Sequence, residues 1–174
     1  MAEKSNQERL EAAIEKIKDA DIKAKAKKVY ESYKDKYLSA PAAKAYHCNW
    51  KGGLLEHTIN VIKHCYELCK EDEQDEMIYL GLIHDLGKIR VYKFAFDTRT
   101  GMEKVEYDSD IDHTYHTIHM LANIDVKLSE EELNAIVYHH GGWSLKNEWI
   151  HPNRFAILLH AADMLSVRKE EKKK

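Results

Sequence analysis

Three stretches of this sequence place histidine and aspartate side chains in apolar surroundings. His84 and Asp85 stand in "GLIHDLGK", His57 stands in "LLEHTINVI", and Asp163 stands in "ILLHAADML". Burying an imidazole or a carboxylate costs free energy unless a partner compensates for it. A lone histidine of this kind is most often a satisfied core residue, and a lone aspartate most often caps a helix. Four such groups on separate segments instead predict a shared partner.

Further histidines are spaced so that they could join the same site. His116 lies between His113 and His119 at three-residue spacing, which puts all three on roughly one helical face. His139 and His140 come directly before two glycines. Helical bundles build metal centres from inward-facing side chains of facing helices. Imidazole and carboxylate without thiolate suit a divalent ion of Mn, Fe, Co, Ni or Zn.

The overall composition is that of an ordinary globular protein. The 174 residues include 27 basic and 30 acidic side chains, so we expect one domain and no long nucleic acid as partner. The first 20 residues are charged throughout, and no apolar run reaches membrane-spanning length. We therefore expect a cytoplasmic protein with no membrane partner. The oligomeric state is left open.

The elements that position these side chains are predicted to be mainly helical, because the chain has only seven glycines and two prolines. Apolar periodicity predicts helices at about residues 10–17, 22–38, 54–68, 75–87, 110–123, 130–140 and 153–168. Gly87 is expected to end the fourth of these helices as a C-terminal glycine. Ser129 and Glu132 have the spacing of a capping box, and Asn153 is expected to be an N-cap.

One segment breaks the helical pattern. Alternating β-prone residues flank "DTRTG", which predicts a β-hairpin at about residues 90–107 with Gly101 in its turn. The fold class is therefore all-α, a helical bundle with one inserted hairpin. We divide the chain into N-terminal helices packed on the core (1–38), a main domain (39–168) and a charged, disordered tail (169–174).

The order of His57, His84-Asp85 and Asp163 resembles the HD superfamily of metal-dependent phosphohydrolases. The stretch "PAAKAYHCNWKGGLLEHT" at residues 41–58 is similar to the segment that opens the HD domain of YhaM-type 3′→5′ exoribonucleases. The stretches "HDLGK", "YHTIHM", "YHHGG" and "HAADML" continue this resemblance in register over roughly residues 38–168. It implies that residues 39–168 form an HD domain.

The resemblance also implies two sets of metal ligands. The first set is His57, His84, Asp85 and Asp163. The second set is Asp85 as a bridge, His116, and one or both of His139 and His140. Members of the superfamily with the additional histidines resemble two-metal enzymes, so two divalent ions are expected here.

Two departures from known relatives narrow the expected substrate. The HD-GYP phosphodiesterases place a glutamate where this chain has Gly53, and their GYP sequence is absent after His140. Hydrolysis of cyclic di-GMP is therefore not expected. The YhaM-type enzymes carry an N-terminal OB-fold that grips single-stranded RNA, whereas this chain has two predicted helices there. Nucleotides, short oligonucleotides or a cyclic dinucleotide are expected in place of long RNA.

The expected reaction is hydrolysis of a phosphodiester or phosphate ester by a metal-activated hydroxide. Two cations about 4 Å apart would clamp the phosphoryl oxygens. Asp85 is expected to be catalytic as the bridge, and Lys88 by facing the phosphate, although Lys88 can also be read as a solvent-facing lysine. Arg90, His47 and Trp50 are expected to contact substrate, with Trp50 either stacking on a base or packing its loop.

Two alternatives stay open at this point. One is a nucleotide phosphomonoesterase, which would use the same metal ligands on a terminal phosphate. The other is a non-catalytic HD module that binds a nucleotide or metal without turnover. The complete ligand set favours an enzyme, because a binding module has no chemical need for all of it.

Overall fold

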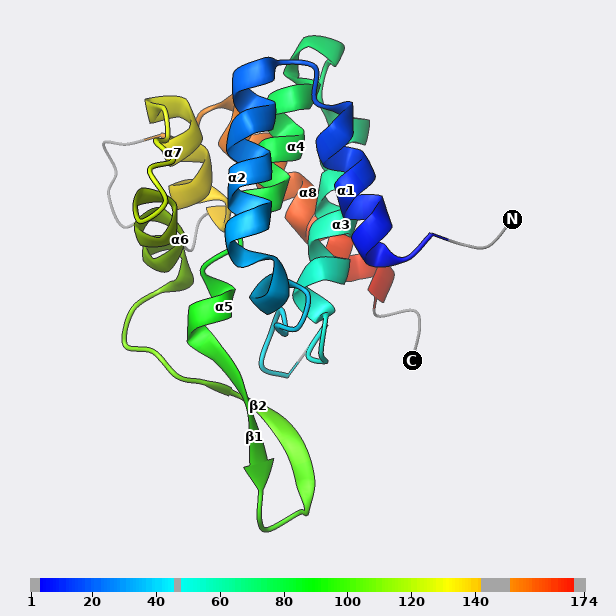
Figure 1. The fold of residues 1–174 in the computed structure, drawn as a ribbon, viewed down its shortest axis with the longest axis vertical. Helices are drawn as coiled ribbons and strands as arrows, with labels where there is room; N and C mark the ends of the chain where they lie inside the picture. The colour runs from blue at the N-terminus through cyan, green and yellow to red at the C-terminus, as the bar shows by residue number, and fades with distance from the viewer. Residues whose placement is uncertain (1–3, 46–47, 142–150, 171–174) are drawn as a thin grey trace.

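The structure is a computed structural model that describes residues 4–45, 48–141 and 151–170. It confirms the predicted fold class, a helical bundle with one two-stranded hairpin (Figure 1). The elements are α1 (Asn6–Lys16), α2 (Ala20–Tyr37), α3 (Gly53–Leu68), η1 (Glu71–Glu73), α4 (Gln74–Ile83), α5 (Lys88–Val91), β1 (Tyr92–Asp97), β2 (Met102–Tyr107), α6 (His113–Ala122), α7 (Glu130–Tyr138) and α8 (Arg154–Glu170).

Helix α4 is the centre of the bundle. Residues 77–83 are all buried, as expected for a helix that is apolar on every side. It packs against α2 and α3, while α8 packs against α3 and α7 (Figure 1). Leu10 of α1 and Val29 of α2 belong to the same hydrophobic core. The N-terminal helices thus contribute to this core, and the domain boundary after residue 38 stays a prediction.

Side-chain caps begin two of the helices that carry site residues. Ser129 and Glu132 form the predicted capping box at the start of α7. Asn153 Oδ1 accepts a hydrogen bond of 2.8 Å from the backbone N–H of Ala156, as expected of an N-cap for α8. These caps fix where α7 and α8 begin. The C-cap of α7 is His139, so the histidine pair lies where this helix ends.

The prediction that Gly87 ends the fourth helix as a C-terminal glycine was wrong. Helix α4 ends at Ile83, and Gly87 has ordinary helical angles (φ −62°, ψ −19°), so it is no left-handed helix end. A Cβ atom at position 87 would lie 1.9 Å from the carbonyl oxygen of His113. The backbone N–H of Gly87 also donates to Thr117 Oγ1 at 2.8 Å. Gly87 is therefore required by the close approach of α6.

The hairpin lies where the sequence predicted it. Strands β1 and β2 are antiparallel, with Tyr92 opposite Tyr107 and Phe94 opposite Val105. Gly101 adopts a left-handed conformation in the turn (φ +71°), which favours glycine. The hairpin extends away from the helical bundle (Figure 1).

Two further predictions concern membrane-spanning helices and the C-terminal tail. None of the helices in the described ranges combines the length and the apolar character that crossing a bilayer requires. Helix α8 continues to Glu170, which is two residues into the predicted tail. The remainder of that tail and His47 lie outside the described residues.

Candidate metal centre

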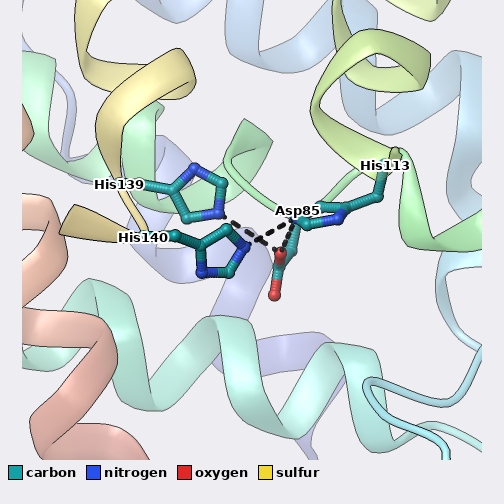
Figure 2. Close-up of side chains that lie close together, drawn as sticks. All are labelled: Asp85, His113, His139 and His140. Carbon is teal, nitrogen blue, oxygen red and sulfur yellow. Dashed lines mark hydrogen bonds and ion pairs between the residues drawn. The ribbon is translucent and has the colours of Figure 1, made fainter. Parts of the chain in front are cut away.

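Two groups of imidazoles and carboxylates meet inside the bundle. In the first, one ligand atom from each of His57 (α3), His84 (after α4) and Asp163 (α8) lies within 4.8 Å of the others. The second group meets the same criterion and is shown in Figure 2. Its members are Asp85, His113, His139 and His140. We call these groups the first and the second cluster.

Asp85 lies between the two clusters and is almost fully buried. Its Oδ2 atom lies 3.2 Å from His57 Nε2 and 3.3 Å from His84 Nε2. Its Oδ1 atom lies 3.3 Å from His113 Nε2 and 3.7 Å from His139 Nε2. Each carboxylate oxygen thus faces a different cluster, which is the geometry of a bridging ligand.

Backbone hydrogen bonds orient two of the imidazoles. His84 Nδ1 lies 2.8 Å from the carbonyl oxygen of Gly81, and His139 Nδ1 lies 2.6 Å from that of Ile136. A carbonyl only accepts, so each Nδ1 carries a hydrogen and Nε2 is the nitrogen that faces the cluster. Metal-binding histidines are typically held in this way.

A buried serine holds the pair formed by His57 and Asp163. His57 Nε2 lies 3.1 Å from Asp163 Oδ1, while His57 Nδ1 lies 3.2 Å from Ser166 Oγ. The Ser166 hydroxyl donates to the carbonyl oxygen of Asp163 at 2.7 Å, so Oγ accepts from His57. The sequence analysis missed Ser166. Its signal is a hydroxyl three residues after Asp163, on the same face of an apolar helix.

The protonation of His57 reflects these carboxylates. Burial lowers the pKa of His57, but hydrogen bonds to Asp163 and Asp85 outweigh it and raise the pKa to about 9. Burial raises the pKa of Asp163, and the hydrogen bond from His57 lowers it below its ordinary value. A proton on His57 therefore compensates the carboxylates, and a divalent ion bound there would displace that proton.

Lys88 is buried beside Asp85 and does not face solvent. It is 8% exposed, and its Nζ lies 2.5 Å from Asp85 Oδ2. Burial lowers the pKa of Lys88, but the charges of Asp85 and Asp163 outweigh it and raise the pKa. The lysine therefore stays cationic at the centre of the site. This burial excludes the solvent-facing alternative, and the contact of Lys88 with a phosphate stays a prediction.

His113, and not His116, lies in the second cluster. His116 is half-buried, and its Nε2 lies 2.9 Å from Ser109 Oγ. The three-residue spacing puts His113, His116 and His119 on one face but does not show which turn approaches Asp85. The contact between Gly87 and the start of α6 brings His113 there. The structure therefore places His113, and not the predicted ligand His116, beside Asp85.

Both His139 and His140 belong to the second cluster. His140 Nε2 is 3.0 Å from His113 Nε2, and burial together with the neighbouring His139 lowers the pKa of His140 to about 3. His160 Nδ1 lies 2.8 Å from the carbonyl oxygen of His139 and donates to it. His160 therefore helps to fix the end of α7 without entering a cluster.

The remaining predicted substrate contacts lie outside the clusters. Arg90 is exposed on α5, where its charge adds to burial in lowering the pKa of His116. Trp50 is 45% exposed in the loop before α3. The structure brings neither side chain into the first or the second cluster.

The donor atoms fit a divalent cation. Asp85 Oδ1 and His139 Nε2 are buried and have no hydrogen-bond partner within the described part of the chain. Both are lone-pair acceptors, and leaving them unsatisfied costs free energy. A cation between them would satisfy both atoms. Imidazole and carboxylate donors suit Mn, Fe, Co, Ni or Zn.

The helical bundle holds the buried pair His84 and Asp85 where the two clusters meet. These features are those of a helical domain that binds metal ions. The chain matches the HD domain family over residues 54–169 and belongs to that family. This finding confirms the resemblance that the sequence motifs indicated.

Two curated relatives cover most of this chain. A 3′-5′ exoribonuclease YhaM from Shouchella clausii is 30% identical over 144 residues, which are 76% of this chain and 43% of the relative. A dihydroneopterin 2′,3′-cyclic phosphate phosphodiesterase from Methanocaldococcus jannaschii is 29% identical over 180 aligned residues, 90% of this chain and 67% of the relative. The chain thus spans less than half of the exoribonuclease. No solved structure gives a significant match.

Proposed function

We propose that the protein is a metal-dependent phosphodiesterase that acts on nucleotides or short oligonucleotides. The observation that carries this proposal is the position of Asp85, whose two oxygens face separate clusters of imidazoles. A single buried carboxylate shared in this way suits two neighbouring cations, which is the arrangement used for phosphoryl displacement.

Two sets of side chains, which share Asp85, would each hold one divalent ion. His57, His84, Asp85 and Asp163 would hold one ion. Asp85, His113, His139 and His140 would hold the other. Bound divalent ions lower the pKa of water and stabilise charge on phosphoryl oxygens.

Lys88 would neutralise a phosphate oxygen at the centre of the site, because its buried ammonium group already lies against Asp85. Burial strengthens this electrostatic interaction compared with the same charge in water. Lys88 would therefore help to orient the phosphate towards the two clusters.

The relatives favour a diester over a monoester. One relative is named as an exoribonuclease and the other as a cyclic phosphate phosphodiesterase, and both names describe the cleavage of a phosphodiester. A phosphomonoesterase and a non-catalytic nucleotide- or metal-binding module remain the alternatives that the test must separate.

The test is turnover with a defined metal content. Purified protein loaded with Mn²⁺ is expected to hydrolyse bis(p-nitrophenyl) phosphate faster than p-nitrophenyl phosphate, to lose activity with a chelator and to regain it when Mn²⁺ is returned. Asp163→Asn is expected to reduce both the metal content and the rate. The exposed Asp110→Asn is the matched control and should keep both.

Two results would contradict the proposal. Faster turnover of the monoester would favour the phosphomonoesterase. Metal retained in the protein without turnover of either ester would favour the binding module. Elemental analysis of each sample distinguishes the second result from simple loss of metal.

A further inference from the structure

A pocket lies beside the hairpin, against the loop that precedes α3. Its volume is about 410 Å³. Lys44, Trp50 and Lys51 line it from the loop, Phe94 lines it from β1, and Lys104 lines it from β2. None of these residues belongs to either metal cluster, so the pocket is a second feature of the molecule.

The charges around this pocket favour an anionic ligand. Three lysines line it, against a single carboxylate, that of Glu103, among the described residues. Lys104 pairs with Glu106 at 3.0 Å, whereas Lys44 and Lys51 form no ion pair with any described residue. Two exposed ammonium groups are thus available to phosphate oxygens.

The aromatic side chains give the pocket flat apolar surfaces. Trp50 is 45% exposed, which favours the stacking interpretation of this residue over simple packing of the loop. Phe94 is half-buried on β1. Aromatic rings combined with lysines are how proteins bind single-stranded nucleic acid without reading its sequence, because every base has a π-face. The pocket therefore has the chemistry of a nucleotide subsite.

The pocket is connected to the metal centre through the backbone. The N–H of Tyr92, the first residue of β1, donates to the carbonyl oxygen of Lys88. Phe94 follows two residues later on the same face of the strand. The helical rise of α5 and the rise of β1 limit the Cα distance between Lys88 and Phe94 to at most about 13 Å. A substrate of two nucleotide units is long enough to reach both residues.

We propose that this hairpin pocket binds the nucleotide adjacent to the one whose phosphodiester is hydrolysed, with its base on Trp50 and its phosphate at Lys44 and Lys51. The proposal rests on the proposed phosphodiesterase function and adds a preference for substrates with at least two nucleotide units. The hairpin and the loop before α3 together would supply a stacking surface for this base.

The experiment compares two diesters that differ by one nucleotide unit. The dinucleotide pApA reaches the hairpin pocket, while adenosine 2′,3′-cyclic phosphate presents a base and a diester without a neighbour. Trp50→Ala and Lys51→Ala are expected to lower the ratio of kcat/KM for pApA to kcat/KM for the cyclic phosphate at least tenfold. Tyr66→Ala, at a ring 44% exposed on α3, and the exposed Lys127→Ala are controls that keep this ratio.

A binding measurement separates this inference from the proposed function. The Kd of pApA for chelated, metal-free protein is expected to rise at least fivefold in Trp50→Ala and in Lys51→Ala, and circular dichroism verifies that each variant is folded. This result supports the subsite even if no diester is turned over. An equal loss for both substrates would overturn the inference, because the pocket would then hold the reacting nucleotide itself. Unchanged kinetics and Kd in both variants would also overturn it and leave the phosphodiesterase proposal intact.

Discussion

At the scale of single side chains, the hydrogen bonds behind each imidazole decide which nitrogen faces the site. Carbonyl oxygens of Gly81 and Ile136 hold His84 and His139, and Ser166 holds His57. All three leave Nε2 directed at a carboxylate. The site is therefore oriented before any ion binds, which reduces the reorganisation that metal binding requires.

His113 and His116 provide a direct test of the second cluster. We expect His113→Ala to weaken metal binding there by at least about tenfold, because it removes a buried nitrogen 3.3 Å from Asp85 Oδ1. His116→Ala, three residues further along the same helix, should bind metal as the parent protein does. Metal titration followed by elemental analysis gives the stoichiometry. Loss of metal in His116→Ala alone would refute the placement of His113.

At the scale of the elements, one close contact sets the position of α6. Because Gly87 has no side chain, the turn after α4 can contact the carbonyl of His113. The backbone N–H of Gly87 also donates a hydrogen bond to Thr117 Oγ1. A side chain at position 87 would separate α6 from the start of α5. The second cluster therefore depends on a residue that contributes no ligand.

Gly87→Ala is expected to destabilise the protein by about 1–3 kcal/mol and to weaken the second metal, because its Cβ would collide with the His113 carbonyl. Gly101→Ala is the control. Nothing lies within 4 Å of a Cβ there, and its left-handed backbone costs about 1 kcal/mol. Thermal unfolding and metal titration of both variants make the comparison. Equal metal affinity in the two variants would show that α6 does not depend on this contact.

How much the sequence could predict differs between these side chains. His57, His84, Asp85 and Asp163 were predictable because each is a polar group inside an apolar run, and their order matched a family. His113 could not be told from His116, because the choice depends on a contact between α5 and α6 that periodicity does not encode. Ser166 was missed because its signal, a hydroxyl three residues after Asp163, points to the site only once Asp163 is known to lie there. The hairpin was predictable from local alternation, and the short helix α5 was not.

At the scale of the whole molecule, a half-buried carboxylate away from the metal centre couples stability to pH. Glu76 of α4 is influenced by the charges of Glu131 and Glu132 of α7, of Lys25 in α2, and of Asp19, the N-cap of α2. Burial, followed by the charge of Glu132, raises the pKa of Glu76 to about 7 from an ordinary value of 4.5. The folded protein therefore holds this proton more tightly than the unfolded chain does.

Because the folded-state pKa is raised, the contribution of Glu76 to stability is complete below about pH 4.5 and is lost as the pH rises through about 7. At pH 8 we expect Glu76→Gln to be more stable than the parent by roughly 2 kcal/mol, and the difference should shrink towards pH 4.5. Urea unfolding across this range measures it. The exposed Glu31→Gln of α2 should follow the parent curve. Parallel curves for Glu76→Gln and the parent would exclude this coupling.

The hydrogen bond between Ser166 and His57 joins positions 109 residues apart. During translation, α3 leaves the ribosome long before α8 has been made, so a nascent chain that has reached only α7 carries His57 without Asp163 or the serine that orients it. The first cluster can then close only after the last helix has emerged and docked. An ion bound at the first cluster would therefore gain its full set of ligands only once α8 has been made and has packed against α3.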